Sequence, residues 1–234
     1  MALKPIAVVG WEDGTAGQVD SWIASCGYEI VCFVHPEDEP PAIDPVAARN
    51  RPAKTFDFPS GGSFKGRPLL CARDWPQAIR ERGIATALVT LADKERRVQE
   101  IRRAQAGGIE PGRAVHPSCV VLPDAVLGCN LIAHAGATIG YRTEIGDGVI
   151  LGIGSQLDHH NVVHEGVTID PAVVTAGNVL IERYAQLHTA AVIINRVKVG
   201  HHAIVAAGAV VISDVEPQTM IAGVPAIVKK KLSP

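Results

Sequence analysis

The sequence predicts two domains of different architecture: a small parallel α/β, Rossmann-like domain over residues 1–110, and a left-handed parallel β-helix of hexapeptide repeats over residues 113–216. Residues 217–234 form a tail over the last coil. Two observations lead to this fold class: a six-residue repeat in the second half of the chain and a strand–helix alternation before it. The composition agrees, because 47% of the 234 residues are hydrophobic but only 4% are aromatic. This balance favours closely stacked, β-branched strands over a helical bundle.

The first 110 residues alternate between strand and helix signals. We expect strands at 6–9, 28–34 and 84–91, and helices at 16–26, 74–82 and 93–106. Between His35 and Pro68, seven prolines and a Gly-Gly pair indicate a long irregular connection. Strands joined in this order by right-handed crossovers form a small parallel sheet.

The repeat begins at Val115 and recurs every six residues to Val211, and fifteen of these seventeen positions are Val, Ile or Leu. A period of six fits neither a helix nor a two-residue alternation. It fits short strands joined by turns, with the aliphatic side chain inside a narrow prism and Gly or Asn at the corner. Three hexads make a coil of 18 residues, so residues 115–216 form about five and two-thirds coils without an excursion loop. Residues 18 apart then lie stacked, roughly 4.8 Å from each other.

This stacking places His159 beside Gly177, one coil further on. His159 occupies an outward-directed place in its hexad, where a neutral imidazole can take a proton from an attacking amine or alcohol. The backbone N–H of Gly177 could bind a thioester carbonyl as that oxygen gains negative charge. A base and an oxyanion donor are the two parts that acyl transfer requires.

Several motifs accompany this pair. They are an N-terminal strand with a glycine-rich turn, Val115-His116-Pro117-Ser118, Leu157-Asp158-His159, Ala176-Gly177-Asn178-Val179, and Ile221-Ala222-Gly223-Val224-Pro225-Ala226. Together, and over nearly the whole chain, they resemble the sugar acyltransferases typified by the sialic acid O-acetyltransferase and the bacillosamine-pathway N-acetyltransferase. The resemblance implies transfer of an acetyl group from acetyl-CoA, as co-substrate, to an amino or hydroxyl group of a sugar that is often nucleotide-linked. The acceptor attacks the thioester directly, and no resident metal is expected.

The resemblance also implies roles for particular residues. His159 is the general base, with His160 beside it and Gly177 near the thioester. The acyl donor lies between neighbouring β-helices, against Gly177, Asn178, Ala206, Ala207, Gly208, Gly223, Val224 and Pro225, with a run of lysines at 229–231 offering charge for a phosphate. The N-terminal domain holds the sugar nucleotide, and the candidate contacts there are Gly10, Gly14, Gly17 and His35.

The sequence departs from the family pattern at four places. His160 stands where an acidic residue usually follows the catalytic histidine, and Thr168 aligns with a second histidine near the donor. Trp11, Glu12 and Asp13 separate glycines that usually form a tighter turn, and His35 replaces an acidic residue after the second strand. These changes leave open the identity of the acceptor, N- against O-acylation, the nature of the acyl group, and a degenerate homologue that binds ligand without catalysis.

A zinc enzyme is the alternative from another class. The spacing from His159 to His164 resembles the metal-binding pair of γ-class carbonic anhydrases, which share the hexapeptide β-helix and bind zinc between subunits. In that interpretation a neighbouring subunit supplies the third ligand. The sequence lacks the early Arg and Asp pattern of those enzymes and carries an α/β domain that they do not have.

Assembly and location follow from surface properties. A prism face carrying Val162, Leu180 and Ile194 is expected to be buried in a homotrimer. A formal charge of -2 argues against nucleic acid or anionic lipid as partners. The five cysteines form no C-x-x-C pair, and no secretory signal or spanning segment precedes them, so we expect a cytoplasmic protein with reduced thiols and no membrane contact.

Overall fold

The computed structural model describes residues 2–11, 14–41, 58–59 and 61–232. The chain divides into two compact units, Met1–Gly112 and Arg113–Pro234. Glu12, Asp13 and most of the proline-rich connection lie outside the described residues. None of the helices in the described ranges has the length and apolar character needed to cross a bilayer.

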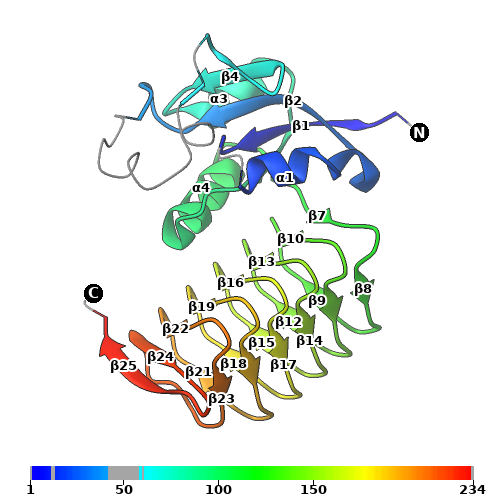
Figure 1. Cartoon of the computed structure of the whole chain (residues 1–234). Helices are drawn as coiled ribbons and strands as arrows, with labels where there is room; N and C mark the ends of the chain where they lie inside the picture. Colours follow the sequence, from blue (N-terminus) through cyan, green and yellow to red (C-terminus); the bar gives the residue numbers. More distant parts are fainter. Residues whose placement is uncertain (1, 12–13, 42–57, 60, 233–234) are drawn as a thin grey trace. The chain divides into compact units, whose positions relative to one another are not determined.

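The first unit is built on one sheet with the strand order β3-β4-β2-β1-β5-β6 (Figure 1). Its strands are β1 (Lys4–Val9), β2 (Tyr28–His35), β3 (Ser63–Phe64), β4 (Arg67–Cys71), β5 (Thr86–Val89) and β6 (Glu110–Pro111). All neighbours pair in parallel except β3 and β4. The central strands are covered on both faces, because Ile6, Val8, Phe33 and Leu88 are fully buried.

The helices of this unit are α1 (Ala16–Asp20), a 3-10 turn η1 (Ile23–Cys26), α3 (Trp75–Arg80) and α4 (Lys94–Ala106). The single helix expected over 16–26 is therefore two short pieces, which end at Gly27 in the left-handed conformation. Helix α4 begins as expected, because the Asp93 carboxylate accepts the N–H of Arg96. The hairpin of β3 and β4 was not expected, since Pro68 lies within it.

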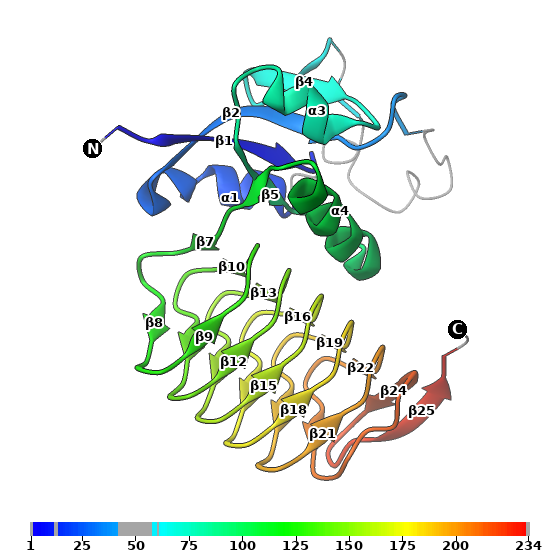
Figure 2. The same ribbon diagram turned by 180° about the vertical axis from the view of Figure 1, so that it is seen from behind.

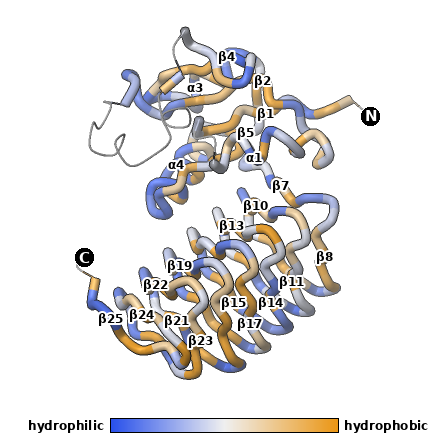
Figure 3. The backbone as a smooth tube through the Cα atoms, in the orientation of Figure 1, coloured by the Kyte–Doolittle hydropathy of each residue, from blue (hydrophilic) through white to orange (hydrophobic). Residues whose placement is uncertain are grey.

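The second unit is a left-handed parallel β-helix with three faces. The first face contains β7 (Ala114–Val115), β10 (Ile132–Ala133), β13 (Ile150–Leu151), β16 (Thr168–Ile169), β19 (Gln186–Leu187), β22 (Ile204–Val205), β24 (Thr219–Ala222) and β25 (Ile227–Lys231). The second contains β8 (Val120–Val121), β11 (Thr138–Ile139), β14 (Gln156–Leu157), β17 (Val174–Thr175), β20 (Val192–Ile193) and β23 (Val210–Val211). The third contains β9 (Val126–Leu127), β12 (Glu144–Ile145), β15 (Val162–Val163), β18 (Leu180–Ile181) and β21 (Lys198–Val199). Figure 2 shows the coils from the opposite side, and Figure 3 shows hydrophobic residues recurring along successive strands.

The register of the coils is the predicted one over most of the prism. Ile132 pairs with Ile150, and the same 18-residue step joins successive coils up to β23. At the C-terminal end the step shortens to 16 residues, because Val199 pairs with Val215 and Ile204 with Met220. The strict repeat therefore ends at β23, short of residue 216. Strand β24 then turns back into the antiparallel β25.

The corners differ from the simple expectation of Gly or Asn. Every sixth residue from Asp124 to Gly208 has a positive φ, and Gly or Asn fills only seven of these fifteen places. The others are Asp124, Arg142, His160, Ala172, Tyr184, Ala190, Arg196 and His202. From Arg142 onward each of these left-handed residues donates its N–H to a carbonyl of the preceding coil, and this hydrogen bond offsets the conformational cost.

The glycines that follow the inward aliphatic residue serve a different purpose: they allow close approach of the next coil. A Cβ on Gly152 would lie 2.5 Å from the backbone N of Pro171, and Gly128, Gly140, Gly146 and Gly200 show similar contacts. These glycines do not adopt a positive φ. They are required by packing between backbones.

Gly152→Ala is therefore expected to lower the free energy of unfolding by roughly 3 kcal/mol, because the added methyl group must push two coils apart. Gly154→Ala is the matched control: no atom lies within 4 Å of its added Cβ, and Ala172 and Ala190 already occupy the same left-handed corner place. Urea unfolding at one fixed protomer concentration compares the two variants. Equal midpoints would contradict the packing explanation.

Acid is expected to destabilise the fold through His134, which is 6% exposed and whose pKa is lowered mainly by burial and also by the neighbouring His116. A lowered pKa in the folded state means that the unfolded chain binds the proton more tightly. Stability is then lost as the pH falls below the unfolded value of about 6.5. His134→Gln should show a smaller loss of thermal stability between pH 7.5 and 5.5 than the parent chain. An unchanged loss would mean that other groups cause the acid sensitivity.

Candidate active site

The two predicted catalytic residues meet at the turn that joins β14 to β15, named here the His159 corner (residues 158–161). The His159 imidazole lies directly against Gly177 of the next coil. A Cβ on Gly177 would lie 2.3 Å from Cε1, 2.5 Å from Nε2 and 2.9 Å from Nδ1 of His159. Only a glycine at position 177 leaves room for the ring in this place.

His160 holds the other side of the His159 ring. The two Nδ1 atoms are 3.0 Å apart, and the rings are nearly perpendicular at 85°. His160 has φ 55° and donates its N–H to the carbonyl of Tyr141, whose ring meets the His160 ring edge to face. Arg142, one coil before His160, directs its guanidinium over the Tyr141 ring and pairs with Asp124 at 3.8 Å.

The backbone of the corner is held at several points. His159 donates its N–H to the Asp158 carboxylate at 2.8 Å, and its carbonyl accepts the N–H of Asn178 at 3.0 Å. The Gly177 carbonyl accepts the N–H of Arg196. The Gly177 N–H, in contrast, has no acceptor among the residues that the structure describes. This N–H is therefore available to a ligand.

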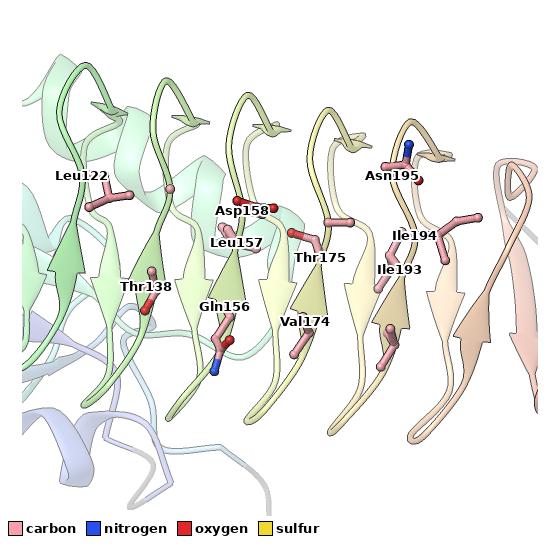
Figure 4. A pocket seen from close by; sticks show the side chains of 13 residues that line it. Leu122, Thr138, Gln156, Leu157, Asp158, Val174, Thr175, Ile193, Ile194 and Asn195 are labelled. Atoms are coloured by element: carbon pink, nitrogen blue, oxygen red, sulfur yellow. The ribbon is translucent and has the colours of Figure 1, made fainter.

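A groove of about 530 Å³ runs along the second face beside this corner (Figure 4). Its walls are mostly apolar and include Val174, Val192 and Ile194, and Asp158 and Ala176 lie at the edge next to His159 and Gly177. The predicted trimer face needs correction here. Val162 and Leu180 pair on the third face, whereas Ile194 follows β20 of the second, so the three residues do not share one face.

The other predicted donor contacts lie elsewhere on the prism. Ala206, Ala207 and Gly208 form the turn between β22 and β23, at the opposite edge of the second face from the His159 corner. Gly223 accepts the N–H of Val210 in β23, which places the Gly223-Val224-Pro225 segment at the C-terminal end of that face. The structure thus brings His159, His160, Gly177 and Asn178 together and leaves the remaining donor residues at the end of the same face.

The predicted acceptor residues are in the first unit. Gly10 follows β1 with φ 131°, and a Cβ there would meet Thr90 Oγ1 at 2.2 Å. His35 ends β2, is 9% exposed and has an Nε2 without a hydrogen-bond partner; burial, together with Arg96, lowers its pKa. Gly17 is buried in α1, and Gly14 is exposed.

His164 lies at a different corner from His159, after β15 and on the third face. It lines a separate pocket of about 430 Å³ with Glu144 and Arg183. Within the described part of this single chain, no group of three or more His, Cys, Asp or Glu side chains is arranged to hold a metal ion.

Three residues near His159 were not identified from the sequence: Tyr141, Thr143 and Asn161. Tyr141 contacts His160, and the other two bond the corner from inside the prism. The available signal was the occurrence of Thr143 and Asn161 at a hexad place that otherwise carries mostly small or β-branched residues.

No family model matches the sequence. A Schizosaccharomyces pombe protein with the provisional name serine acetyltransferase is 37% identical over 113 residues, which cover 44% of this chain and 42% of that protein. The chain thus matches less than half the length of this curated relative.

Solved structures extend the comparison to the whole chain. PerB from Caulobacter crescentus, in complex with CoA and GDP-perosamine, is similar with a TM-score of 0.82 and 27% identity over 98% of this chain and 99% of that chain. The chain resembles the sugar N-acetyltransferases. A perosamine N-acetyltransferase variant from the same bacterium, with one histidine replaced by asparagine, is 26% identical over 98% of both chains, also with a TM-score of 0.82. The acetyltransferase domain of PglB from Neisseria gonorrhoeae, solved with acetyl-CoA, shares the fold with a TM-score of 0.79 at 24% identity over 97% of this chain and 100% of that domain.

These comparisons confirm the predicted resemblance and the predicted fold class. They also confirm the CoA-dependent acetyltransferase class, with acetyl-CoA as its co-substrate. The roles of individual residues are taken up as proposals.

Proposed function

We propose that this chain transfers an acetyl group from acetyl-CoA to an amino or hydroxyl group of a nucleotide-linked sugar, with His159 as the general base. The observation that carries the proposal is the contact of the His159 ring with Gly177. It places a proton acceptor beside a backbone N–H that has no acceptor among the described residues. The similarity over 98% of the chain to a protein that binds CoA and GDP-perosamine supports the choice of donor and acceptor.

The tautomer of His159 decides whether it can act as a base. Two lone pairs cannot form a hydrogen bond, so one of the facing Nδ1 atoms must carry a proton. When His159 Nδ1–H donates to His160 Nδ1, the lone pair of His159 remains on Nε2. His160 then performs, as a neutral acceptor, the orienting task that an acidic residue performs elsewhere in the family.

The reaction follows from this arrangement. The acceptor nitrogen or oxygen attacks the thioester carbon and forms the new C–N or C–O bond, while its proton moves to Nε2 of His159. The Gly177 N–H stabilises the carbonyl oxygen as it becomes negative. The C–S bond then breaks, and the CoA thiolate leaves and takes up the proton from His159.

The groove on the second face provides an apolar wall for the pantetheine arm of the donor, beside Asn178 and the His159 corner. The small residues at 206–208 keep its far edge open, and the Gly223-Val224-Pro225 segment with Lys229 to Lys231 lies at its C-terminal end. We assign acceptor binding to Gly10, Gly14, Gly17 and His35 of the first unit, and we propose that the working assembly is a homotrimer in the cytoplasm. A trimer would cover the exposed apolar residues Val174, Val192 and Ile194, which are 37–38% exposed in the single chain.

The deciding experiment measures CoA release with acetyl-CoA and a panel of nucleotide-linked amino sugars. His159→Ala should slow turnover by about 10²- to 10⁴-fold while acetyl-CoA binding stays close to that of the parent, because the ring is outside the prism core. His160→Asn should cost less, since Asn tolerates the left-handed corner and removes only the orienting contact. His164→Ala should be nearly silent.

Metal content measured on the same variants tests the zinc alternative. A zinc hydratase would lose metal and activity equally in His159→Ala and His164→Ala, with no requirement for acetyl-CoA. A fully active His159→Ala enzyme would remove the proposed base. Binding of acetyl-CoA without turnover of any acceptor would indicate a non-catalytic homologue.

Gly177→Ala tests the contact itself. The added Cβ would occupy the place of the imidazole, so we expect the ring to be displaced and turnover to fall by about 10²-fold. If the loss acts through His159, the Gly177→Ala, His159→Ala double variant will be no slower than His159→Ala alone. Multiplicative losses would mean that Gly177 acts independently of the ring.

A further inference from the structure

Three polar side chains are buried inside the prism directly beneath the His159 corner. Thr143 and Asn161 are 0% exposed and Thr175 is 1% exposed. Thr175 replaces an inward aliphatic residue of the repeat, and Thr143 and Asn161 occupy the place two residues before such a residue. The polar exceptions of successive coils therefore meet at one level of the prism.

Their hydrogen bonds converge on the peptide group that precedes His159. Asn161 Nδ2 donates to the Asp158 carbonyl at 2.7 Å and to Thr175 Oγ1 at 3.0 Å, and its Oδ1 accepts the N–H of Val179 at 2.7 Å. Thr143 Oγ1 donates to the same Asp158 carbonyl at 2.8 Å. The other end of this peptide, the His159 N–H, is held by the Asp158 carboxylate. Side chains thus fix both polar groups of the 158–159 peptide.

Folding of the turn does not by itself require an asparagine. The same hexad place carries Val at the six corners whose residues are Val149, Val167, Val173, Val179, Val197 and Val215. All six valines are buried in the same prism as Asn161. Ser155 shows that a polar residue at this place need not form a network, because its buried hydroxyl has no partner.

We propose that Asn161 and Thr143 are positioning residues for His159, an inference that rests on the proposed function. Their two donors fix the plane of the 158–159 peptide and thereby the direction in which the His159 side chain leaves the backbone. This direction keeps the imidazole over Gly177 with Nδ1 facing His160. A small rotation of the peptide moves the ring away from the acceptor nucleophile, and misplacement of about 1 Å costs up to about 10²-fold in rate.

Asn161→Val and Thr143→Val test the proposal, with Ser155→Val as the control at the same hexad place. We expect kcat to fall by roughly 10- to 100-fold in Asn161→Val and by roughly 10-fold in Thr143→Val. The KM for acetyl-CoA should not change in either variant, and Ser155→Val should keep the parental kcat. Thr143→Ser retains the donor and should restore most of the rate.

A second measurement is independent of turnover: hydrogen exchange of the His159 N–H. This exchange should become faster in Asn161→Val and Thr143→Val but not in Ser155→Val. Thr143→Val is nearly isosteric and leaves the acceptor of Val179 in place, so it tests the proposal even if Asn161→Val unfolds. Parental kcat in Thr143→Val, or parental exchange at His159 in both variants, would overturn the positioning role.

The outcome for the proposed function is read separately. If the parent chain transfers no acetyl group, or if His159→Ala is fully active, the proposed base is wrong whatever the valine variants do. If His159→Ala is slow but Thr143→Val has the parental kcat, only the positioning role is wrong.

Discussion

The structure depends on the parallel ladder that joins each coil to the next at a spacing of 18 residues. This ladder determines which residues become neighbours, because positions far apart in sequence align in columns along the prism. One such column at the His159 corner contains Asp124, Arg142, His160, Asn178 and Arg196, all in the left-handed conformation. The ladder uses backbone groups, so it leaves the outward side chains free to vary. A site can therefore be built at one corner without changing the coil that supports it.

The left-handed corner residues show how the backbone tolerates functional side chains. A left-handed conformation costs a non-glycine residue roughly 1–2 kcal/mol, yet Arg142, His160, Tyr184 and others adopt it here. The hydrogen bond from each such N–H to the preceding coil offsets this cost. At His160 that bond goes to Tyr141, whose ring also contacts the His160 ring. The strained backbone and the contact that orients the side chain thus come from the same residue.

The repeat made the prism, its register and the His159–Gly177 neighbourhood predictable, because one period of six determines every column. Contacts within a corner were not predictable, since the direction of the His159 ring depends on side-chain torsions that the period does not specify. The assignment of Ile194 to the face of Val162 and Leu180 failed because the turn after β20 begins one residue earlier than the repeat alone implies. In the first unit no period exists, so short elements such as β3 and β4 and the break after Asp20 left little signal.

Departures from the repeat are informative when their hydrogen bonds are considered together. A buried hydroxyl or amide without a partner costs about 1–3 kcal/mol, so a prism of aliphatic side chains tolerates few of them. Ser155 is such a group, and its position at a different corner from His159 gives it no evident task. Asn161 and Thr143 are satisfied, and each donates to the same carbonyl one residue before His159. What distinguishes a structural exception from a functional one in this fold is therefore the direction of its hydrogen bonds toward one shared backbone group.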